Sequence, residues 1–565
     1  MVEAATSDRP GNDVQVLVVG MGPTGAALAG LLGQRGVRTA VYDKLSALFP
    51  LPRAVGMDHE VMRIAQELGI ADRLDGLVEP YRPSEYHGVD GQVIKRLDSR
   101  PPPHRLGWDP LFVFNQPAFE TVLRERLSEL PTVSMSVESE VVGFGQDAAG
   151  AWADVLGPDD EHPRRVRGDY LVACDGGASA VRSGLGITMT DLGFHESWLV
   201  IDALVEDDEV LARLPQTQVQ YCEPSRPSTF VYLTGRHRRW EIALEPGELS
   251  IGPVPVDHVW HWLERWIEPG EATIWRAAAY TFRSLVADEW RRGRVLLAGD
   301  AAHMTPPFMA QGMATGMRDA QNLAWKLEAV LAGRAGEHLL DSYAEERRPH
   351  TIATTKHAIA LGRVICERDE TAARARDREL LAPYDGTVPV TFRSTFLPPL
   401  TDGLFAFDTP GAGELLPQPF VVGADGAQRL DDVVGPGLLV VCSSSVQIED
   451  LARLELAWSV VGGHVVRVRR SQERTVAASG NGDVVECDDV MSTWLDGLGR
   501  PIAIARPDHG VFGTAATVEE ALALIDRILT AFAVAGPTGR GQAVEMPPLP
   551  DAPVLQSSPR TPFRA

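Results

Sequence analysis

The stretch that decides the fold is Val14-Gln-Val-Leu-Val-Val-Gly20-Met-Gly22-Pro-Thr-Gly25. Val14–Val19 is apolar at all but one position, as is typical of a strand buried on both faces. Ala26–Arg35 predicts a helix that opens on the last glycine, and Val37–Tyr42 predicts a second strand. The stretch therefore predicts the first β-α-β unit of an α/β domain, over about 30 residues.

The glycine turn between this strand and helix has the features of a dinucleotide-binding site. Gly20 permits the tight turn, Gly22 lets the backbone approach a pyrophosphate, and Gly25 allows the helix to pack closely on the strand. Asp43 closes the second strand, where a carboxylate accepts hydrogen bonds from ribose hydroxyls. A glycine triplet alone is often only a turn, but strand, helix and terminal acid in register predict a dinucleotide. They do not separate FAD from NAD.

A second segment, Arg294-Val-Leu-Leu-Ala-Gly-Asp-Ala-Ala-His303, predicts a buried strand that delivers Asp300 at its carboxyl end, where ligands bind in open α/β sheets. Asp300 can accept a hydrogen bond from a ribityl hydroxyl, and Pro306–Pro307 predicts a stiff loop. The turn Gly312–Gly316 opens the helix Met317–Leu331, whose amides and dipole can stabilise negative charge on a reduced flavin. The alternative is a capped helix after a buried strand, with Asp300 only a cap.

A third segment is the apolar strand Tyr170–Ala173, followed by Cys174-Asp-Gly-Gly-Ala-Ser-Ala-Val-Arg182. Its alternative interpretation is a β-turn with a solvated Asp, which is the commonest use of Asp-Gly. From about Leu192 to Phe282 the pattern changes to runs such as Phe230–Thr234 and Arg239–Leu244, which predict antiparallel strands. The sequence therefore predicts a parallel sheet with an antiparallel sheet inserted into it.

Charge and cysteine usage exclude several classes of protein. The net charge of −24 argues against nucleic acids and anionic membranes as partners, since both select basic surfaces. The five cysteines form no Cys-x-x-Cys pair, which removes the main support for a metal site or a redox dithiol and suits a reducing cytoplasm. The start of the chain has no signal-peptide pattern, and no apolar run of about 18 residues predicts a transmembrane helix. We therefore expect a cytoplasmic protein without a metal.

The three segments, in this order, resemble the flavin-dependent aromatic hydroxylases typified by p-hydroxybenzoate hydroxylase. Further matches are Gly316-Met-Arg-Asp-Ala-Gln-Asn-Leu-Ala-Trp-Lys-Leu327 and Pro52-Arg-Ala-Val-Gly-Met57. The resemblance runs from about Val14 to Arg348 and is nearest to the 3-(3-hydroxyphenyl)propionate and 3-hydroxycinnamate hydroxylases. The C-terminal part, which carries Ala505-Arg-Pro-Asp-His509, resembles the thioredoxin-like unit of that subgroup, which lacks redox cysteines.

The resemblance implies an α/β fold with an α+β insert, divided into four parts. A Rossmann-like FAD-binding domain is expected over residues 1–190 and 284–400, interrupted by a substrate-binding antiparallel sheet domain over 191–283. A thioredoxin-like domain without redox cysteines is expected over 401–535, followed by a Pro-rich tail over 536–565. The C-terminal domain is a candidate interface for a homodimer, but the sequence does not decide the oligomeric state.

FAD is the cofactor that the resemblance implies, with NADH or NADPH as co-substrate. Arg53 matches the family's arginine along the FAD diphosphate, and Gln116 matches a glutamine that contacts the cofactor. Arg53 and Asp175 are candidates to serve both cofactors. Ala314 stands where the family usually has Asn, so the flavin loop departs from the family's pattern at this position. The cofactor-binding residues implied in this way are Gly20, Gly22, Pro23, Thr24, Gly25, Asp43, Lys44, Arg53, Gly56, Gln116, Asp175, Gly176, Gly299, Asp300, Pro307, Gly312 and Met313.

The implied activity is an aromatic monooxygenase reaction in two halves. NAD(P)H reduces FAD, and reduced FAD reacts with O2 to give a C4a-hydroperoxide that hydroxylates a phenol, for example one like 3-(3-hydroxyphenyl)propionate. No second glycine fingerprint is visible, so the nicotinamide is expected to bind transiently. The alternative is a tailoring monooxygenase, a hydroxylase or a Baeyer–Villiger enzyme, acting on a polycyclic aromatic natural product. An alternative from a different class of protein is a non-catalytic FAD-binding interaction module.

A phenol reacts better as phenolate, so a base near the substrate is expected. The candidates are His59, Tyr232 and His237, although a structural or surface role is the commoner fate of a lone residue of these types. For His303 a packing role is the better interpretation. The candidate substrate contacts are Pro306, Phe308, Tyr232 and Trp240.

Overall fold

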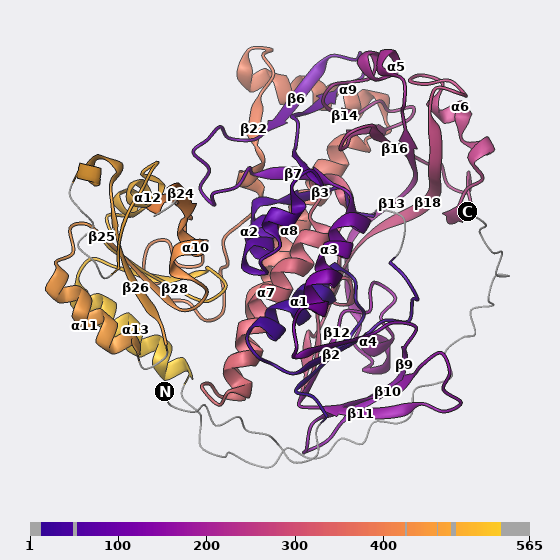
Figure 1. Cartoon of the computed structure of the whole chain (residues 1–565). Helices are drawn as coiled ribbons and strands as arrows, with labels where there is room; N and C mark the ends of the chain where they lie inside the picture. Colours follow the sequence, from indigo (N-terminus) through magenta and orange to yellow (C-terminus); the bar gives the residue numbers. More distant parts are fainter. Residues whose placement is uncertain (1–12, 49–52, 424–425, 460–461, 476–481, 533–565) are drawn as a thin grey trace.

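The computed structural model describes residues 13–48, 53–423, 426–459, 462–475 and 482–532. The expectations for the polar N-terminus, for Pro52 and for the Pro-rich tail from residue 536 lie outside the described residues. Figure 1 shows the C-terminal elements grouped on one side of the molecule, beside a larger body that contains the two main sheets. None of the described helices is long and apolar enough to cross a membrane.

A six-stranded sheet is built around the glycine turn. Five of its strands are parallel, and the edge strand β19 is antiparallel to β20. In spatial order the strands are β19 (Arg291–Arg292), β20 (Val295–Leu297), β12 (Tyr170–Ala173), β1 (Val16–Val19), β2 (Thr39–Tyr42) and β8 (Val133–Ser136). The helices α1 (Pro23–Gln34), α3 (Gln116–Ser128) and α7 (Gly312–Leu331) pack with these strands in one core. The strand–turn–helix–strand unit that the glycine stretch predicts is therefore present.

The second large sheet is mostly antiparallel and draws on three distant parts of the sequence. In spatial order its strands are β17 (Gly252–Pro253), β18 (Thr273–Ala287), β13 (Met189–Leu204), β16 (His237–Ala243), β15 (Ser228–Tyr232), β14 (Gln218–Tyr221), β5 (Ser84–His87), β6 (Val93–Asp98) and β22 (Val390–Phe392), with β21 (His303–Met304) beside β18. The sheet thus extends beyond the 191–283 segment expected for it. One face packs against α5 (Asp208–Arg213) and α6 (Trp260–Leu263) in an apolar core.

The C-terminal elements form a mixed sheet with helices around it. Its strands are β27 (Asp483–Val485), β26 (His464–Arg469), β25 (Leu439–Ser443), β28 (Ile502–Ala505) and β29 (Val511–Ala515). Its helices are α10 (Leu430–Val434), α11 (Ile448–Trp458), α12 (Val490–Leu498) and α13 (Val518–Phe532), and a hairpin is formed by β23 (Phe420–Gly423) and β24 (Gly426–Arg429). Trp325 from α7 packs into the core of this unit, with its ring 6.1 Å from that of Phe532.

The remaining elements connect these sheets. The strands are β3 (Gly56–Asp58), β4 (Val78–Pro80) and β7 (Leu111–Phe114) in one small sheet, and β9 (Glu140–Gln146), β10 (Ala151–Leu156) and β11 (Arg164–Gly168) in another. The helices are α2 (His59–Glu67), α4 (Ala180–Gly184), α8 (Asp341–Ile365) and α9 (Glu370–Leu381). Helix α3 starts at Gln116, because Phe114 ends β7 and the Asn115 side chain caps the helix by accepting from the Ala118 amide.

Candidate active site

A cavity of about 370 Å³ lies between the ligand-facing edge of the parallel sheet and one face of the antiparallel sheet. The three sequence segments singled out above converge on it. This follows from the fold, because the carboxyl ends of parallel strands meet at one edge of a sheet. The expected cofactor residues that line the cavity are Gly22, Pro23, Thr24, Arg53, Gly56, Gln116, Gly176, Asp300, Pro307, Gly312 and Met313.

The glycine turn leaves room for a ligand on one side and packs tightly on the other. A Cβ added at Gly25 would lie 2.0 Å from the Gly20 carbonyl oxygen, so the first turn of α1 rests directly on the turn. A Cβ added at Gly22 would meet no atom within 4 Å, and this residue lines the cavity. The Asp43 carboxylate at the end of β2 accepts from the Met21 amide at 2.9 Å, while the neighbouring Lys44 is exposed. The space beside Gly22 fits a diphosphate held at the N-terminus of a helix.

Asp175 presents a buried acceptor next to the cavity. One carboxylate oxygen accepts from the Val181 amide at 3.2 Å, whereas Oδ1 is buried and has no partner among the described residues. Burial raises the pKa of Asp175. Its neighbours Cys174 and Gly176 line the cavity. A buried oxygen without a donor fits a ligand that carries hydroxyl or amide groups, as FAD does.

Gln116 holds the loop that carries Arg53. Its Oε1 accepts from the Arg53 amide at 2.9 Å and from the Ala54 amide at 2.7 Å, and its Nε2 donates to Glu120 at 2.7 Å. The Arg53 carbonyl accepts from Arg239 Nη1 at 3.2 Å, which ties the loop to the antiparallel sheet. The Arg53 side chain is exposed at the cavity. Gln116 therefore shapes the cofactor loop through its backbone.

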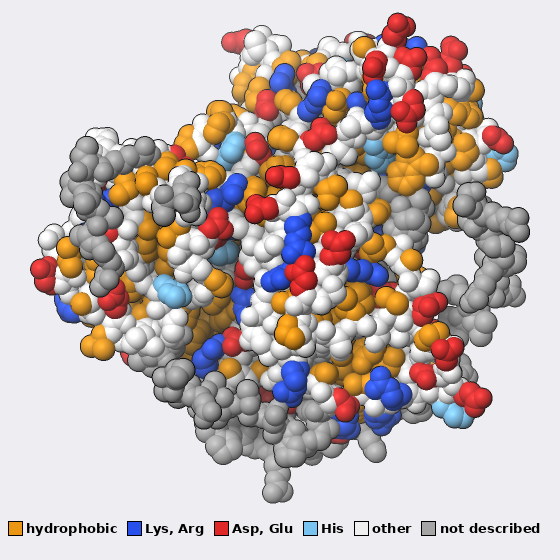
Figure 2. Space-filling model, in the orientation of Figure 1, with side chains coloured by type: hydrophobic (Ala, Val, Ile, Leu, Met, Phe, Trp, Pro, Cys, Tyr) orange, Lys and Arg blue, Asp and Glu red, His pale blue; other side chains and the backbone are white. Residues whose placement is uncertain are grey.

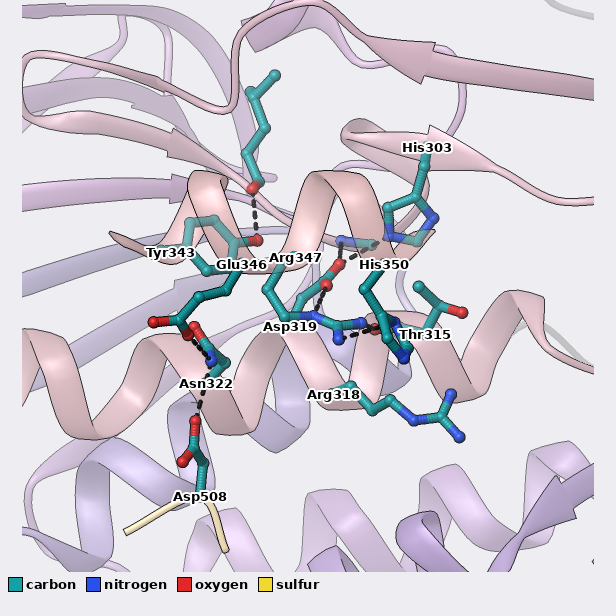
Figure 3. A network of polar contacts seen from close by, with 12 residues as sticks. His303, Thr315, Arg318, Asp319, Asn322, Tyr343, Glu346, Arg347, His350 and Asp508 are labelled. Atoms are coloured by element: carbon teal, nitrogen blue, oxygen red, sulfur yellow. Dashed lines mark hydrogen bonds and ion pairs between the residues drawn. The ribbon is translucent and has the colours of Figure 1, made fainter. Parts of the chain in front are cut away.

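Asp319, in the second turn of α7, fastens the turn that carries Asp300. Its Oδ2 accepts from the Gly299 amide at 3.1 Å and from His303 Nε2 at 2.7 Å, and Oδ1 accepts from Arg347 Nε at 2.9 Å (Figure 3). Burial by itself would raise the pKa of Asp319, but His303 and Arg347 outweigh burial and hold the pKa below its ordinary value. The charged carboxylate therefore fixes three donors around the flavin turn.

Arg318, the residue before Asp319 in α7, holds the loop that leads into this helix at Gln311 and Gly312. Arg318 binds Asp58, donates to Glu60 at 2.7 Å and donates to Gln311 Oε1 at 2.8 Å. Gln311 is the N-cap of α7, so the hydrogen bond from Arg318 sets the position of the helix start beside Gly312. Ala314, where the family usually has Asn, is fully buried in α7. The loop is thus anchored from Gln311 without a polar side chain at the Asn position.

The antiparallel sheet contributes a polar wall to the same cavity. Strand register places Val200, Glu241, Thr229 and Gln220 in one row across β13, β16, β15 and β14, and all four line the cavity. The next row contains Arg276, Asp202, Arg239 and Val231 across β18, β13, β16 and β15. Of this row, all but Asp202 line the cavity. Aromatic lining comes from Tyr81, Tyr280, Phe282 and Phe308.

Asp202 is the anion behind this wall. It is fully buried and accepts from Arg239 Nε at 2.7 Å, from Arg276 Nη1 at 3.0 Å and from His237 Nε2 at 2.8 Å. Burial would raise the pKa of Asp202, but the charge of Arg239 and the hydrogen bond from His237 hold it well below its ordinary value. The two arginines are thereby fixed with their side chains only 2% and 3% exposed.

None of the three candidate bases is among the residues that line this cavity. His237 is buried against Asp202 and Trp275. Tyr232 is stacked between two arginines, Arg82 and Arg238, at 3.7 Å and 3.9 Å. His59 begins α2 and lines a separate cavity of about 350 Å³ between the larger body and the C-terminal unit.

Of the candidate substrate contacts, Phe308 lines the cavity, and Pro306 precedes the lining residue Pro307. Trp240 lies on the opposite face of the sheet, where its ring packs 5.6 Å from Phe230 in the outer core. His303 is fully buried and stacks on Trp290 at 5.4 Å. The sequence did not single out the polar lining residues Gln220, Thr229, Glu241, Arg276 and Tyr280. One sequence feature could have indicated them: Arg239 and Glu241 alternate with Trp240 and Ile242 in one strand, which gives the strand one polar face and one apolar face.

Known families match both parts of the chain. Residues 13–358 match the FAD binding domain family, and residues 413–531 match the HcaD C-terminal domain family. The chain belongs to the FAD binding domain family. Within the described residues, no group of three or more His, Cys, Asp or Glu side chains is placed to hold a metal ion.

Curated relatives match over nearly the whole chain. A protein of Rhodococcus jostii named probable NADH-specific resorcinol 4-hydroxylase is 36% identical, over 92% of this chain and 95% of its own length. A 3-(3-hydroxy-phenyl)propionate/3-hydroxycinnamic acid hydroxylase 2 of Burkholderia vietnamiensis is 34% identical, over 88% of this chain and 93% of its own length. Among solved structures, the anhydrotetracycline hydroxylase OxyS of Streptomyces rimosus superposes with a TM-score of 0.71 at 25% identity, over 92% of this chain and 99% of that one.

Proposed function

We propose that this protein is an FAD-dependent, NADH-consuming monooxygenase that hydroxylates a small phenol. One observation carries the proposal: the flavin motifs and a polar, partly aromatic wall line a single cavity. The curated relatives support it, since their names describe hydroxylases of resorcinol and of 3-(3-hydroxyphenyl)propionate, one of them NADH-specific. Bound FAD would supply the chemistry of taking a hydride from the nicotinamide and activating O2.

The chain's own residues would hold and orient the cofactor. The α1 N-terminus at Gly22 offers its amides and dipole to the diphosphate, and Asp43 would accept from the ribose. Asp300, in the turn after β20, would accept from the ribityl chain. The amides of Gly312 and Met313 at the start of α7 would stabilise negative charge on the reduced ring.

We propose that the two large sheets belong to domains with different functions, because the cavity lies between them. The parallel sheet and its helices act as a Rossmann-like FAD-binding domain, and the antiparallel sheet acts as the substrate-binding domain. The C-terminal unit is proposed to be thioredoxin-like, and its mixed five-stranded sheet with helices around it supports this. A homodimer through this unit remains part of the proposal, and light scattering of the purified protein tests it.

The polar wall favours a small phenol with further polar groups. Glu241, Thr229 and Gln220 in one row, and two arginines in the next, offer hydrogen bonds to hydroxyl or carboxylate substituents. A site that hydrogen-bonds a substrate strongly rejects analogues that lack the partner group. The likeness to OxyS supports the second candidate, a tailoring monooxygenase on a polycyclic aromatic compound.

A substrate panel tests the proposal. The purified protein should oxidise NADH faster with resorcinol or 3-(3-hydroxyphenyl)propionate, and mass spectrometry should find each product one oxygen atom heavier. 3-Phenylpropionate, which lacks the phenol, is the matched control and should gain no oxygen. If only polycyclic phenols are oxygenated, the tailoring function replaces this one. If flavin is bound but no phenol stimulates NADH use, a non-catalytic FAD-binding module is favoured.

A further inference from the structure

The cavity contains one carboxylate on its substrate side. Among the described residues that line it, the carboxylates are Asp300 and Glu241. Asp300 lies in the flavin turn after β20, whereas Glu241 lies in the middle of β16, in the polar wall. Since His59, Tyr232 and His237 do not line the cavity, the base that a phenol requires has to come from elsewhere. We propose that the Glu241 carboxylate accepts the proton of the substrate's phenolic hydroxyl.

This assignment rests on the proposed function, and strand register supports it independently of any bound ligand. Glu241 pairs with Val200 on one side and Thr229 on the other, and all three face the cavity. Trp240 and Ile242, the residues on either side of Glu241, point into the outer core because successive side chains alternate between faces. The direction of the Glu241 side chain is therefore fixed by the sheet.

The charges of the wall are balanced while Glu241 is ionised. Asp202 carries one negative charge against the two positive charges of Arg239 and Arg276. Glu241 Oε1 lies 3.6 Å from Arg239 Nη1, so an ionised Glu241 balances the remaining positive charge. When the proton moves from the phenol to Glu241, the negative charge moves to the phenolate in the same cavity. Asp202 stays ionised and remains the partner of both arginines throughout.

The surroundings also favour Glu241 as a proton acceptor. Burial raises its pKa above the ordinary value of a glutamate, and the neighbouring Arg239 offsets this only in part. A carboxylate with a raised pKa is a stronger base toward a phenol. The titratable or charged groups that face it are Arg239 on its own strand, Asp202 on β13, and Arg276 and Tyr280 on β18. Across the cavity the charged lining groups are Arg53, Arg283, Asp300 and Arg393.

The step balances without a further reactant. The phenolic O–H bond breaks, an O–H bond forms on a carboxylate oxygen of Glu241, and the electron pair stays on the phenolate oxygen. The phenolate then donates this electron density into the ring, which makes the ring a better nucleophile toward an electrophilic oxygen. No electron leaves or enters the substrate in this step.

Glu241→Gln tests the assignment, because it keeps the size of the side chain and an oxygen that can accept from Arg239. The matched control is Glu196→Gln, a half-buried carboxylate on β13 of the same sheet whose pKa burial also raises, but which does not line the cavity. FAD content and reduction by NADH should be retained in both variants, and product formation is compared at substrate concentrations that saturate each variant, judged from the change in flavin absorbance. Glu241→Asp serves as a second variant if the Gln protein folds poorly.

The expected loss lies in product formation and its pH profile. Near neutral pH, Glu241→Gln should form product roughly 100-fold or more slowly than wild type, and NADH consumption should yield hydrogen peroxide in place of product. In the wild type the rate should rise with pH as Glu241 ionises, at a pH above the ordinary glutamate range. In the variant this rise should move to the higher pH at which the phenol itself ionises. A ring-fluorinated phenol, which is more acidic, should recover much of the loss.

Two results separate failure of this assignment from failure of the proposed function. If Glu241→Gln keeps the wild-type product yield and pH profile, or if the more acidic phenol brings no recovery, Glu241 is not the proton acceptor, while the proposed function stands. If the wild-type protein hydroxylates no phenol at all, the proposed function and this assignment both fail. Glu196→Gln should match the wild type in every measurement.

Discussion

Asp319→Asn removes one buried negative charge while keeping the size of the side chain. In the wild type this carboxylate is fully buried and accepts from Gly299, His303 and Arg347. Breaking a buried ion pair on one side costs about 3–5 kcal/mol, because the remaining charge, here that of Arg347, loses its partner. We therefore expect the free energy of unfolding to fall by about that amount.

The same substitution should weaken FAD binding, because Asp319 positions the turn that carries Asp300. A hydrogen bond to a charged group is worth about 1.5–3 kcal/mol. At about 1.4 kcal/mol per tenfold, its loss at Gly299 predicts a dissociation constant for FAD roughly 10- to 100-fold higher.

Titration of the apoprotein with FAD, followed by flavin fluorescence, measures the affinity, and urea unfolding measures the stability. The control is Asp341→Asn, whose ion pair with Arg291 is on the surface, with the Asp341 side chain 60% exposed. Surface pairs contribute about 0–1 kcal/mol, so this variant should stay close to the wild type. Unchanged FAD affinity and unchanged stability in Asp319→Asn would refute the reasoning that α7 fixes the flavin turn through this carboxylate.

Three further substitutions test other parts of the account. Asp300→Ala should purify largely colourless, with FAD affinity lowered roughly 10- to 100-fold, and full flavin absorbance would remove Asp300 from cofactor binding. Arg53→Ala should slow the reduction of bound FAD by NADH in stopped-flow absorbance, and an unchanged rate would exclude Arg53 from that step. Arg506→Leu leaves the buried carboxylates of Glu346 and Asp508 without their arginine, and should lower the stability to urea by about 3–5 kcal/mol. A urea midpoint equal to that of the wild type would show that this ion network does not hold the C-terminal unit.

The elements around the cofactor could be predicted because short-range patterns decide them. The strand Tyr170–Ala173 is observed with the predicted bounds, and the predicted helix over Met317–Leu331 lies within α7, which starts earlier at Gly312. The convergence of the three segments also follows from sequence, since parallel strands present their carboxyl ends at one edge. These predictions need no knowledge of which distant strands pair.

The polar wall could not be predicted, because it depends on pairing between distant strands. Whether Trp240 or Glu241 faces the cavity is decided by a shift of one residue, which turns every side chain of a strand to the other face. The predicted strand Arg239–Leu244 has the right alternation, but both of its faces are buried, so hydrophobicity does not show which face meets the substrate. Strands β5, β6 and β22 join the same sheet from positions far outside the 191–283 segment.

The sequence patterns also did not predict how the C-terminal unit packs against the rest of the chain. Glu346 on α8 is fully buried and pairs with Lys326 and Arg506. Asn322 donates to both Glu346 and Asp508 (Figure 3). These residues are spread over more than one hundred positions, and each in isolation resembles an ordinary polar or charged surface residue. On the face shown in Figure 2, acidic and basic side chains lie interspersed. The same residue types thus occur on the surface and in the buried ion network, so residue type does not show which charges are buried.

Isotope labelling shows whether the protein transfers one atom of O2 to a phenol. The protein is incubated with NADH, FAD, resorcinol or 3-(3-hydroxyphenyl)propionate, and heavy-isotope O2 in ordinary water, and the product is analysed by mass spectrometry. The account predicts a product that carries one labelled oxygen atom in a new hydroxyl group on the ring. A hydroxylated product whose new oxygen comes from water, or the absence of any oxygenated product while NADH is consumed, would contradict it.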